Sequence, residues 1–162
     1  MTGGQYRDLI AAYLARNFEK RGLRVFTEVR IGKSTIGKER QIDVFAYDES
    51  TKRALAFECK TQNTNGTADE KLVYAIQDIE AMRMPGAIIY AGEGFSPGVV
   101  QMLRASPSAL YCLPDPETLS SGGTETRELD VFLAQELGWW DIVTVSYEHR
   151  RFDWRKYTTE NA

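Results

Sequence analysis

Two carboxylates and a lysine have the types and spacing that suit metal-assisted chemistry on a phosphate. Asp43 lies in an apolar run at residues 41–47, and Glu58 and Lys60 lie in a second apolar run at residues 53–60. The polar residues between the runs have a length typical of a β-hairpin. The sequence therefore predicts two antiparallel strands that carry the three charged side chains.

The pairing of these strands decides whether the carboxylates meet. If the hairpin turns around residues 50 and 51, Asp43 lies opposite Glu58, and the Cβ atoms of such a pair are about 4.5–5.5 Å apart. Glu58 and Lys60 share a face because side chains alternate along a strand. We expect the three groups to gather at the open end of the hairpin.

Such a pair of carboxylates needs a cation if it is buried. The strands are otherwise nearly all apolar on both faces, which is typical of the centre of a covered sheet. Desolvation and like-charge repulsion disfavour two ionised carboxylates there. Oxygen ligands favour Mg²⁺, or Mn²⁺ in its place, with phosphate or water as further ligands. Lys60 is then placed to activate a water or neutralise phosphate charge. The alternative is an ordinary cross-strand salt bridge on a solvated face.

The rest of the chain supplies elements that hold this hairpin. The predicted fold class is α/β, with a mixed central sheet flanked by helices. We expect a core at residues 1–113 and a loop and extension at residues 114–162 packed on it, as a single domain overall. The predicted helices are residues 4–21, 70–84, 96–105 and 128–137, and the predicted strands are residues 23–31, 41–47, 53–60, 87–91, 110–113 and 142–147.

Composition excludes several other classes of protein. The 162 residues include two cysteines and one histidine, which argues against a disulfide framework, a zinc site or a Ser-His-Asp triad. The net charge is −3, but residues 1–40 hold nine Lys and Arg against four Asp and Glu. No apolar stretch approaches about 20 residues and no signal pattern begins the chain, so we expect a cytoplasmic protein without membrane contact.

The hairpin residues and the order of elements resemble the PD-(D/E)XK nuclease superfamily, which has the restriction-endonuclease-like fold. That family places an Asp at the start of one strand and Glu/Asp-x-Lys on the next, in the order helix, three strands, helix, strand. Residues 4–92 follow this order. Asp43 matches the first position and Glu58 and Lys60 the second and third, although Gln41-Ile42 replaces the Pro that often precedes the Asp.

The resemblance implies roles for single residues. It makes Asp43 and Glu58 metal ligands together with the backbone carbonyl of Cys59, and it lets Lys60 position or activate the attacking water. Gln62 continues this strand face, where related nucleases often carry a polar residue; a plain strand-end role is the alternative. Asp8 is the positional match for a further acidic ligand on the first helix, and a solvated Asp that favours the helix dipole explains it equally well.

Basic residues near the hairpin suit contact with nucleic acid. Phosphates are contacted mainly by Lys and Arg side chains. Lys71 matches a lysine at a helix start that faces DNA in some restriction-like nucleases. The others flank or fill the connection after the first strand, for which an ordinary solvated loop is the alternative: Arg30, Lys33, Lys38 and Arg40.

Together these features predict a Mg²⁺-dependent nuclease that hydrolyses phosphodiester bonds, as a DNA endonuclease of the restriction, resolvase or homing type. By resemblance the products carry 5′-phosphate and 3′-hydroxyl ends. Cutting both strands of a duplex needs two sites, so we expect a homodimer or higher oligomer. RNA as substrate and exonuclease action stay open. The alternatives are a catalytically inactive nucleic-acid-binding module of the same fold and a protein-interaction domain.

Overall fold

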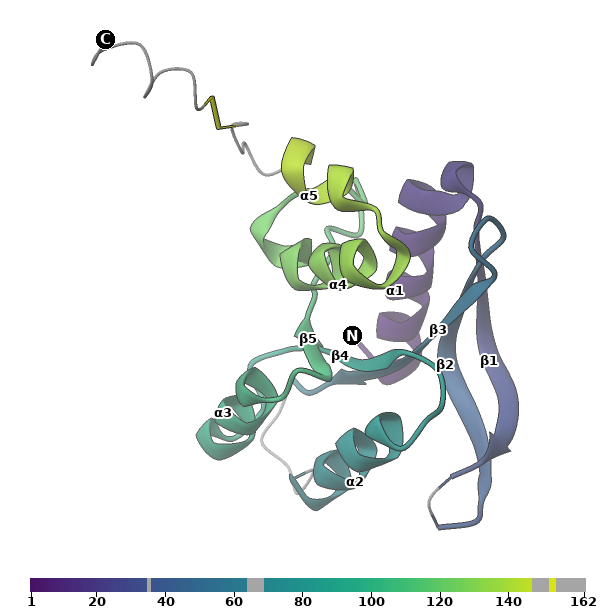
Figure 1. Cartoon of the computed structure of the whole chain (residues 1–162). Coiled ribbons are helices and arrows are strands. Elements are labelled where there is room, and N and C mark those ends of the chain that lie inside the picture. Colours follow the sequence, from purple (N-terminus) through teal and green to yellow (C-terminus); the bar gives the residue numbers. More distant parts are fainter. Residues whose placement is uncertain (35, 64–68, 147–151, 154–162) are drawn as a thin grey trace, which may run out of the picture.

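A five-stranded mixed sheet with helices on both faces forms the protein (Figure 1). The computed structural model describes residues 1–34, 36–63, 69–146 and 152–153. In chain order the elements are α1 Gly3–Phe18, the 3₁₀ turn η1 Glu19–Arg21, β1 Leu23–Lys33, β2 Glu39–Asp48, β3 Arg53–Thr61, α2 Asp69–Glu80, β4 Gly86–Ala91, α3 Pro97–Ala105, β5 Ala109–Tyr111, the 3₁₀ turn η2 Thr124–Thr126, α4 Arg127–Leu137 and α5 Trp140–Ser146.

The sheet has the order β1-β2-β3-β4-β5. The first three strands form an antiparallel meander, and β4 and β5 continue the sheet in parallel with β3. The two parallel steps cross over through α2 and α3, as parallel neighbours require. The predicted hairpin register is confirmed, because Val44 pairs with Phe57 and Tyr47 with Ala54.

The first helix is built as its sequence indicates. Thr2 caps α1 in a capping box with Gln5, in which each side chain accepts a hydrogen bond from the other residue's backbone N–H. Its apolar positions are buried against the sheet, and Gly22, with φ of 99°, ends the following 3₁₀ turn and starts β1. Asn63, just after β3, donates a hydrogen bond to the carbonyl of Met1, which ties the start of the chain to the end of β3.

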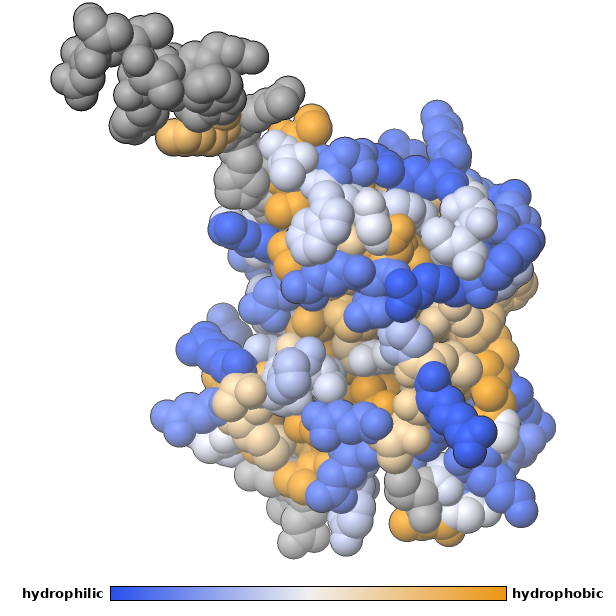
Figure 2. Space-filling model, viewed as in Figure 1, coloured by the Kyte–Doolittle hydropathy of each residue, from blue (hydrophilic) through white to orange (hydrophobic). Residues whose placement is uncertain are grey.

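Two hydrophobic cores lie on opposite faces of the sheet. The larger core joins α1, α4 and α5 to one face, and the smaller joins α2 and α3 to the other. Asp130 of α4 is buried and accepts hydrogen bonds from the hydroxyls of Tyr13 and Thr126 and from the backbone N–H of Gly122. This network ties α4 to α1. In Figure 2 hydrophobic residues gather in the band between α4 and α2 on the visible face.

The C-terminal part differs from the prediction at one element. Residues 142–147 were expected to form a strand because four β-branched residues follow one another there, but Trp140–Ser146 is helix α5. Gly138, with φ of 74°, ends α4 and turns the chain back, and Ile142 then packs on the large core while Val145 stays exposed. Tertiary packing outweighs the local preference. Residues 147–151 and 154–162 of the predicted extension lie outside the described part, and its division from the core at residue 113 stays a prediction.

Other differences are small. The predicted helix at residues 70–84 ends earlier, at Glu80, and the chain turns through residues 81–85 before β4. The predicted cap of α3 is confirmed, since Ser96 accepts a hydrogen bond from the N–H of Val99 and Pro97 begins the helix. Within the described residues no helix combines the length and apolar character needed to cross a membrane.

Candidate active site

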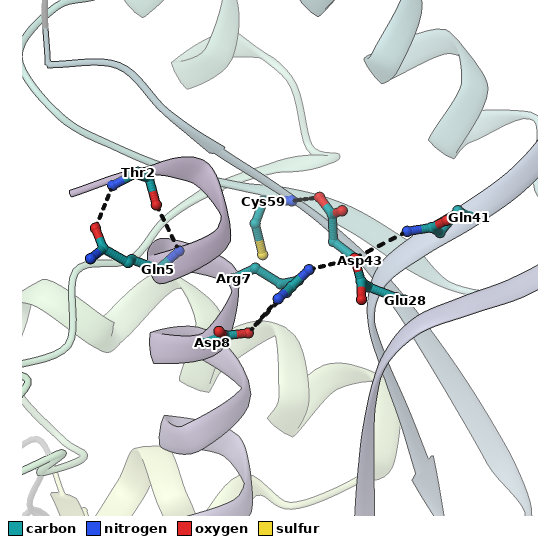
Figure 3. Close-up of polar contacts among 8 residues, drawn as sticks. All are labelled: Thr2, Gln5, Arg7, Asp8, Glu28, Gln41, Asp43 and Cys59. Carbon is teal, nitrogen blue, oxygen red and sulfur yellow. Dashed lines mark hydrogen bonds and ion pairs between the residues drawn. The ribbon is translucent and has the colours of Figure 1, made fainter.

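Asp43 is held where β2 and β3 begin to separate. The last paired residues of the ladder on this side are Val44 and Phe57. One step beyond them, the Asp43 carboxylate accepts a hydrogen bond of 2.8 Å from the backbone N–H of Cys59 (Figure 3). The side chain of Asp43 is therefore fixed to the backbone of β3, next to Glu58.

Glu58 and Lys60 form a close ion pair on β3. The Lys60 Nζ lies 3.1 Å from Glu58 Oε2, and the Glu58 side chain is 21% exposed. Burial raises the pKa of Glu58 to about 7, and the nearby Asp43 charge adds to this while Lys60 opposes it. Burial alone would lower the pKa of Lys60, but the Glu58 and Asp43 carboxylates outweigh it and raise that pKa. The site therefore holds a protonated lysine beside a carboxylate that is costly to ionise.

A cavity of about 640 Å³ opens between β3 and α2 beside this pair, and we call it the β3–α2 cavity. Glu58, Lys60 and Gln62 line one side of it, and Lys71 lies on the α2 side. Four of the predicted site residues thus border one space. Asp43 adjoins Glu58 but is not part of the cavity wall.

Gln62 links the end of β3 to the loop after β4. Its side-chain Nε2 donates to the carbonyl of Gly94, and its own carbonyl accepts from the Gly94 N–H. The loop approaches so closely that a Cβ on Gly92 would lie 2.3 Å from the Gln62 carbonyl oxygen, and Gly92 also has a φ of 111°. Gln62 therefore shapes the rim of the β3–α2 cavity, and its contact with the reacting groups stays a prediction.

Asp8 is turned toward an arginine. Its carboxylate pairs with Arg7, which also contacts Glu28 of β1, and the Asp8 side chain is 63% exposed (Figure 3). Across the described residues, no group of three or more His, Cys, Asp or Glu side chains is arranged to hold a metal ion. The structure thus gives no support to Asp8 as a third ligand, and that role stays a prediction.

The remaining carboxylate pair still fits a hard divalent cation. Two oxygen donors, without His or Cys, match the ligands that Mg²⁺ takes from proteins, which usually number one or two. The raised pKa of Glu58 reports a carboxylate whose burial the lysine does not fully offset, and a cation at this point would favour its charged form. The carbonyl of Cys59 as a further ligand stays a prediction.

The predicted basic residues fall into two groups. Arg40 is held in a paired contact with the Asp78 carboxylate of α2, at 2.7 and 3.0 Å, and its side chain is only 12% exposed. This guanidinium fastens α2 to β2, which makes it unsuitable for phosphate contact. The other predicted basic residues are exposed: Arg30, Lys33, Lys38 and Lys71. Among them, Arg30 has a long contact of 3.8 Å with the Glu39 carboxylate.

The sequence reasoning missed apolar residues at the mouth of the cavity. Ile36, in the connection between β1 and β2, is 68% exposed, and Tyr74 of α2 is 65% exposed; both line the β3–α2 cavity. A signal was available for Tyr74, because an aromatic residue stands beside the buried face of α2 defined by Leu72 and Ile79 and does not belong to it.

One comparison with known proteins covers most of the chain. A family profile described as a PD-(D/E)XK nuclease superfamily domain matches residues 2–140. The crystal structure of a protein of unknown function, AF1548, is similar at 22% identity over 60% of this chain, with a TM-score of 0.39. The chain spans about half of that protein, 53% of its length. A comparison with curated proteins returned no match.

The family match covers the helix, the strand meander and both crossovers, and it includes the two strands that bring Asp43, Glu58 and Lys60 together. The mixed sheet flanked by helices is consistent with the restriction-endonuclease-like fold. The chain belongs to the PD-(D/E)XK nuclease superfamily.

Proposed function

We propose that this protein is a Mg²⁺-dependent nuclease that hydrolyses phosphodiester bonds in DNA, with Asp43 and Glu58 as metal ligands and Lys60 as the residue that assists the water nucleophile. The observation that carries the proposal is the Glu58–Lys60 pair, which adjoins Asp43 and borders the β3–α2 cavity. A protein that only bound nucleic acid would have no need for a half-buried carboxylate pair at this point, since unpaired charges there cost stability.

Each of the three residues contributes a separate property. Bound Mg²⁺ supplies a Lewis acid that lowers the pKa of a water and offsets charge on the phosphate. Asp43 is held by the Cys59 N–H, so its carboxylate is preorganised. Glu58 has a pKa of about 7, so it exchanges its proton near neutral pH and can bind a cation in place of that proton. Lys60 is the cation that already pairs with its carboxylate. Lys60 stays protonated and can donate to a phosphate oxygen or orient the attacking water.

The substrate and assembly are part of the same proposal. The exposed basic residues Lys33, Lys38 and Lys71 suit contact with the phosphates of a nucleic acid that reaches the cavity. Endonuclease action on both strands of a duplex would require two copies of the site and therefore a homodimer or higher oligomer. Mn²⁺ is expected to replace Mg²⁺, because it accepts the same oxygen ligands.

The test is cleavage of supercoiled, linear, single-stranded and branched DNA, each with Mg²⁺, Mn²⁺ or EDTA. We expect metal-dependent cleavage by the wild type and a loss of about 100-fold or more in Lys60→Ala and Asp43→Asn, as for removal of a charge-stabilising group. Lys20→Ala is the matched control, because Lys20 is exposed in η1 outside the cavity wall.

Two results would contradict the proposal. If the wild type and Lys60→Ala behave alike on every substrate, the catalytic assignment fails. If the protein binds DNA equally in Mg²⁺ and EDTA without cutting it, it is a binding module of the same fold. Melting curves of each variant exclude loss of folding as the cause.

A further inference from the structure

We propose that the β3–α2 cavity is a subsite for one unpaired nucleotide, so that the substrate strand enters the site as a single strand or as a locally opened duplex. This inference rests on the nuclease function proposed above. It assigns Tyr74 and Ile36 as the residues that hold the base, and Lys60 and Lys71 as the groups that contact the phosphates on either side.

The size and position of the cavity favour a single nucleotide. Its volume of about 640 Å³ lies within the range of pockets that enclose a small-molecule ligand, about 300–1,000 Å³. Glu58 and Lys60 belong to its wall, so a nucleotide seated there has a phosphate beside the proposed metal ligands. A base inside a duplex is stacked and paired on both sides and must leave the stack before it can enter such a pocket.

The mouth of the cavity offers a stacking surface. Tyr74 and Ile36 come from α2 and from the β1–β2 connection, yet both line the cavity and both are about two-thirds exposed. Exposed aromatic side chains beside a basic groove bind bases by stacking without regard to sequence. Phe95 and Leu72 are buried behind them and give the cavity an apolar floor.

Charge completes the subsite. Lys71, at the start of α2, lines the same cavity and is exposed, so its ammonium is placed for the phosphate that follows the bound nucleotide. With Lys60 on the opposite wall, a strand that threads the cavity meets a cation on either side. A rigid duplex could reach Lys71 without using Tyr74, and this difference makes the inference testable.

The experiment measures binding and cleavage of an oligodeoxynucleotide that carries 2-aminopurine, as a single strand and as a matched duplex, in Ca²⁺ for binding and Mg²⁺ for cleavage. We expect the wild type to bind the single strand more tightly and to quench its fluorescence by stacking. Tyr74→Ala should weaken single-strand binding about 10-fold and abolish the quenching, while Tyr74→Phe retains both.

A control variant separates a contact with the base from a general effect of removing an exposed ring. Phe26→Ala is the matched control, because Phe26 is an exposed ring on β1 that does not line the cavity. It should bind and quench like the wild type.

The outcomes distinguish this inference from the nuclease function. If Tyr74→Ala binds the single strand like the wild type, or if duplex and single strand bind equally, the subsite is refuted even where cleavage is normal. If the wild type cleaves nothing in Mg²⁺ but still binds and quenches the single strand through Tyr74, the subsite stands and the nuclease function fails.

Discussion

Replacing Glu58 by Gln should stabilise the metal-free protein while it abolishes cleavage. Glu58 has a pKa of about 7 in the folded chain, against an ordinary value of 4.5, chiefly because it is buried. The folded state therefore binds more protons than the unfolded state between these two pH values, and stability falls as the pH rises through this window. Gln is close in shape to the protonated carboxyl and is free of this cost.

The magnitude follows from the two pKa values. Each pH unit of difference corresponds to about 1.4 kcal/mol, so the ionised Glu58 costs about 3 kcal/mol of stability above pH 7. The attraction of Lys60 is already included, because it acts on the same pKa. For a chain of this length, such a gain raises the melting temperature by about 6–12 °C. The gain should shrink to near zero as the pH falls toward 4.5.

The assay is urea unfolding of wild type and Glu58→Gln in EDTA, at a pH below and a pH above the Glu58 pKa. Glu117→Gln, a change at an exposed loop carboxylate, is the matched control and should alter stability by less than about 0.5 kcal/mol. Added Mg²⁺ should stabilise the wild type and reduce its deficit against the variant. If the wild type and Glu58→Gln have the same free energy of unfolding at high pH, or if that free energy depends on pH in the same way in both, then ionised Glu58 does not destabilise the folded protein and the reasoning is refuted.

Three further changes test how the site is supported. Gly92→Ala places a Cβ against the Gln62 carbonyl at a positive φ, so it should lower the melting temperature strongly, whereas Gly98→Ala, in open space on α3, should not. Tyr13→Phe removes a donor to the buried Asp130 and should cost about 1–3 kcal/mol in urea unfolding; no loss would mean that this network is dispensable. Arg40→Met removes the guanidinium that pairs with Asp78 of α2 and should cost about 1–3 kcal/mol, with a larger effect on KM than on kcat; unchanged stability would contradict a fastening role.

Much of the hairpin could be predicted because its cues are local. The polar turn and the alternation of side chains together allow one register, and a slip of one residue would expose the apolar face. For this reason the pairing of Val44 with Phe57 follows from sequence, and so does the approach of Asp43 to Glu58. The caps of α1 and α3 are equally local signals.

Contacts between distant segments could not be predicted in this way. Arg40 looked like one more cation in a basic loop, but the crossover helix α2 brings a carboxylate to it from 38 residues away. Gln62 was a predicted site residue with a plain strand-end role as the alternative, and the parallel pairing of β3 with β4 brings the Gly94 carbonyl to its amide. The β-branched residues of α5 likewise adopt a helix, and this helix buries Ile142 in the core and packs Val143 against it.

The sequence by itself determined the hairpin and the three charged residues at its open end, because turn chemistry and a period of two act over a few neighbouring residues. The family followed from the resemblance of these residues and of the order of elements to PD-(D/E)XK nucleases, and the match over residues 2–140 confirms it. Only the tertiary structure decided which cations remain exposed, which carboxylate is costly to ionise, and that a cavity with Tyr74 and Ile36 among its lining residues lies beside Glu58. Burial and the meeting of separate segments set these properties, and neither is encoded in the spacing of residues along one strand.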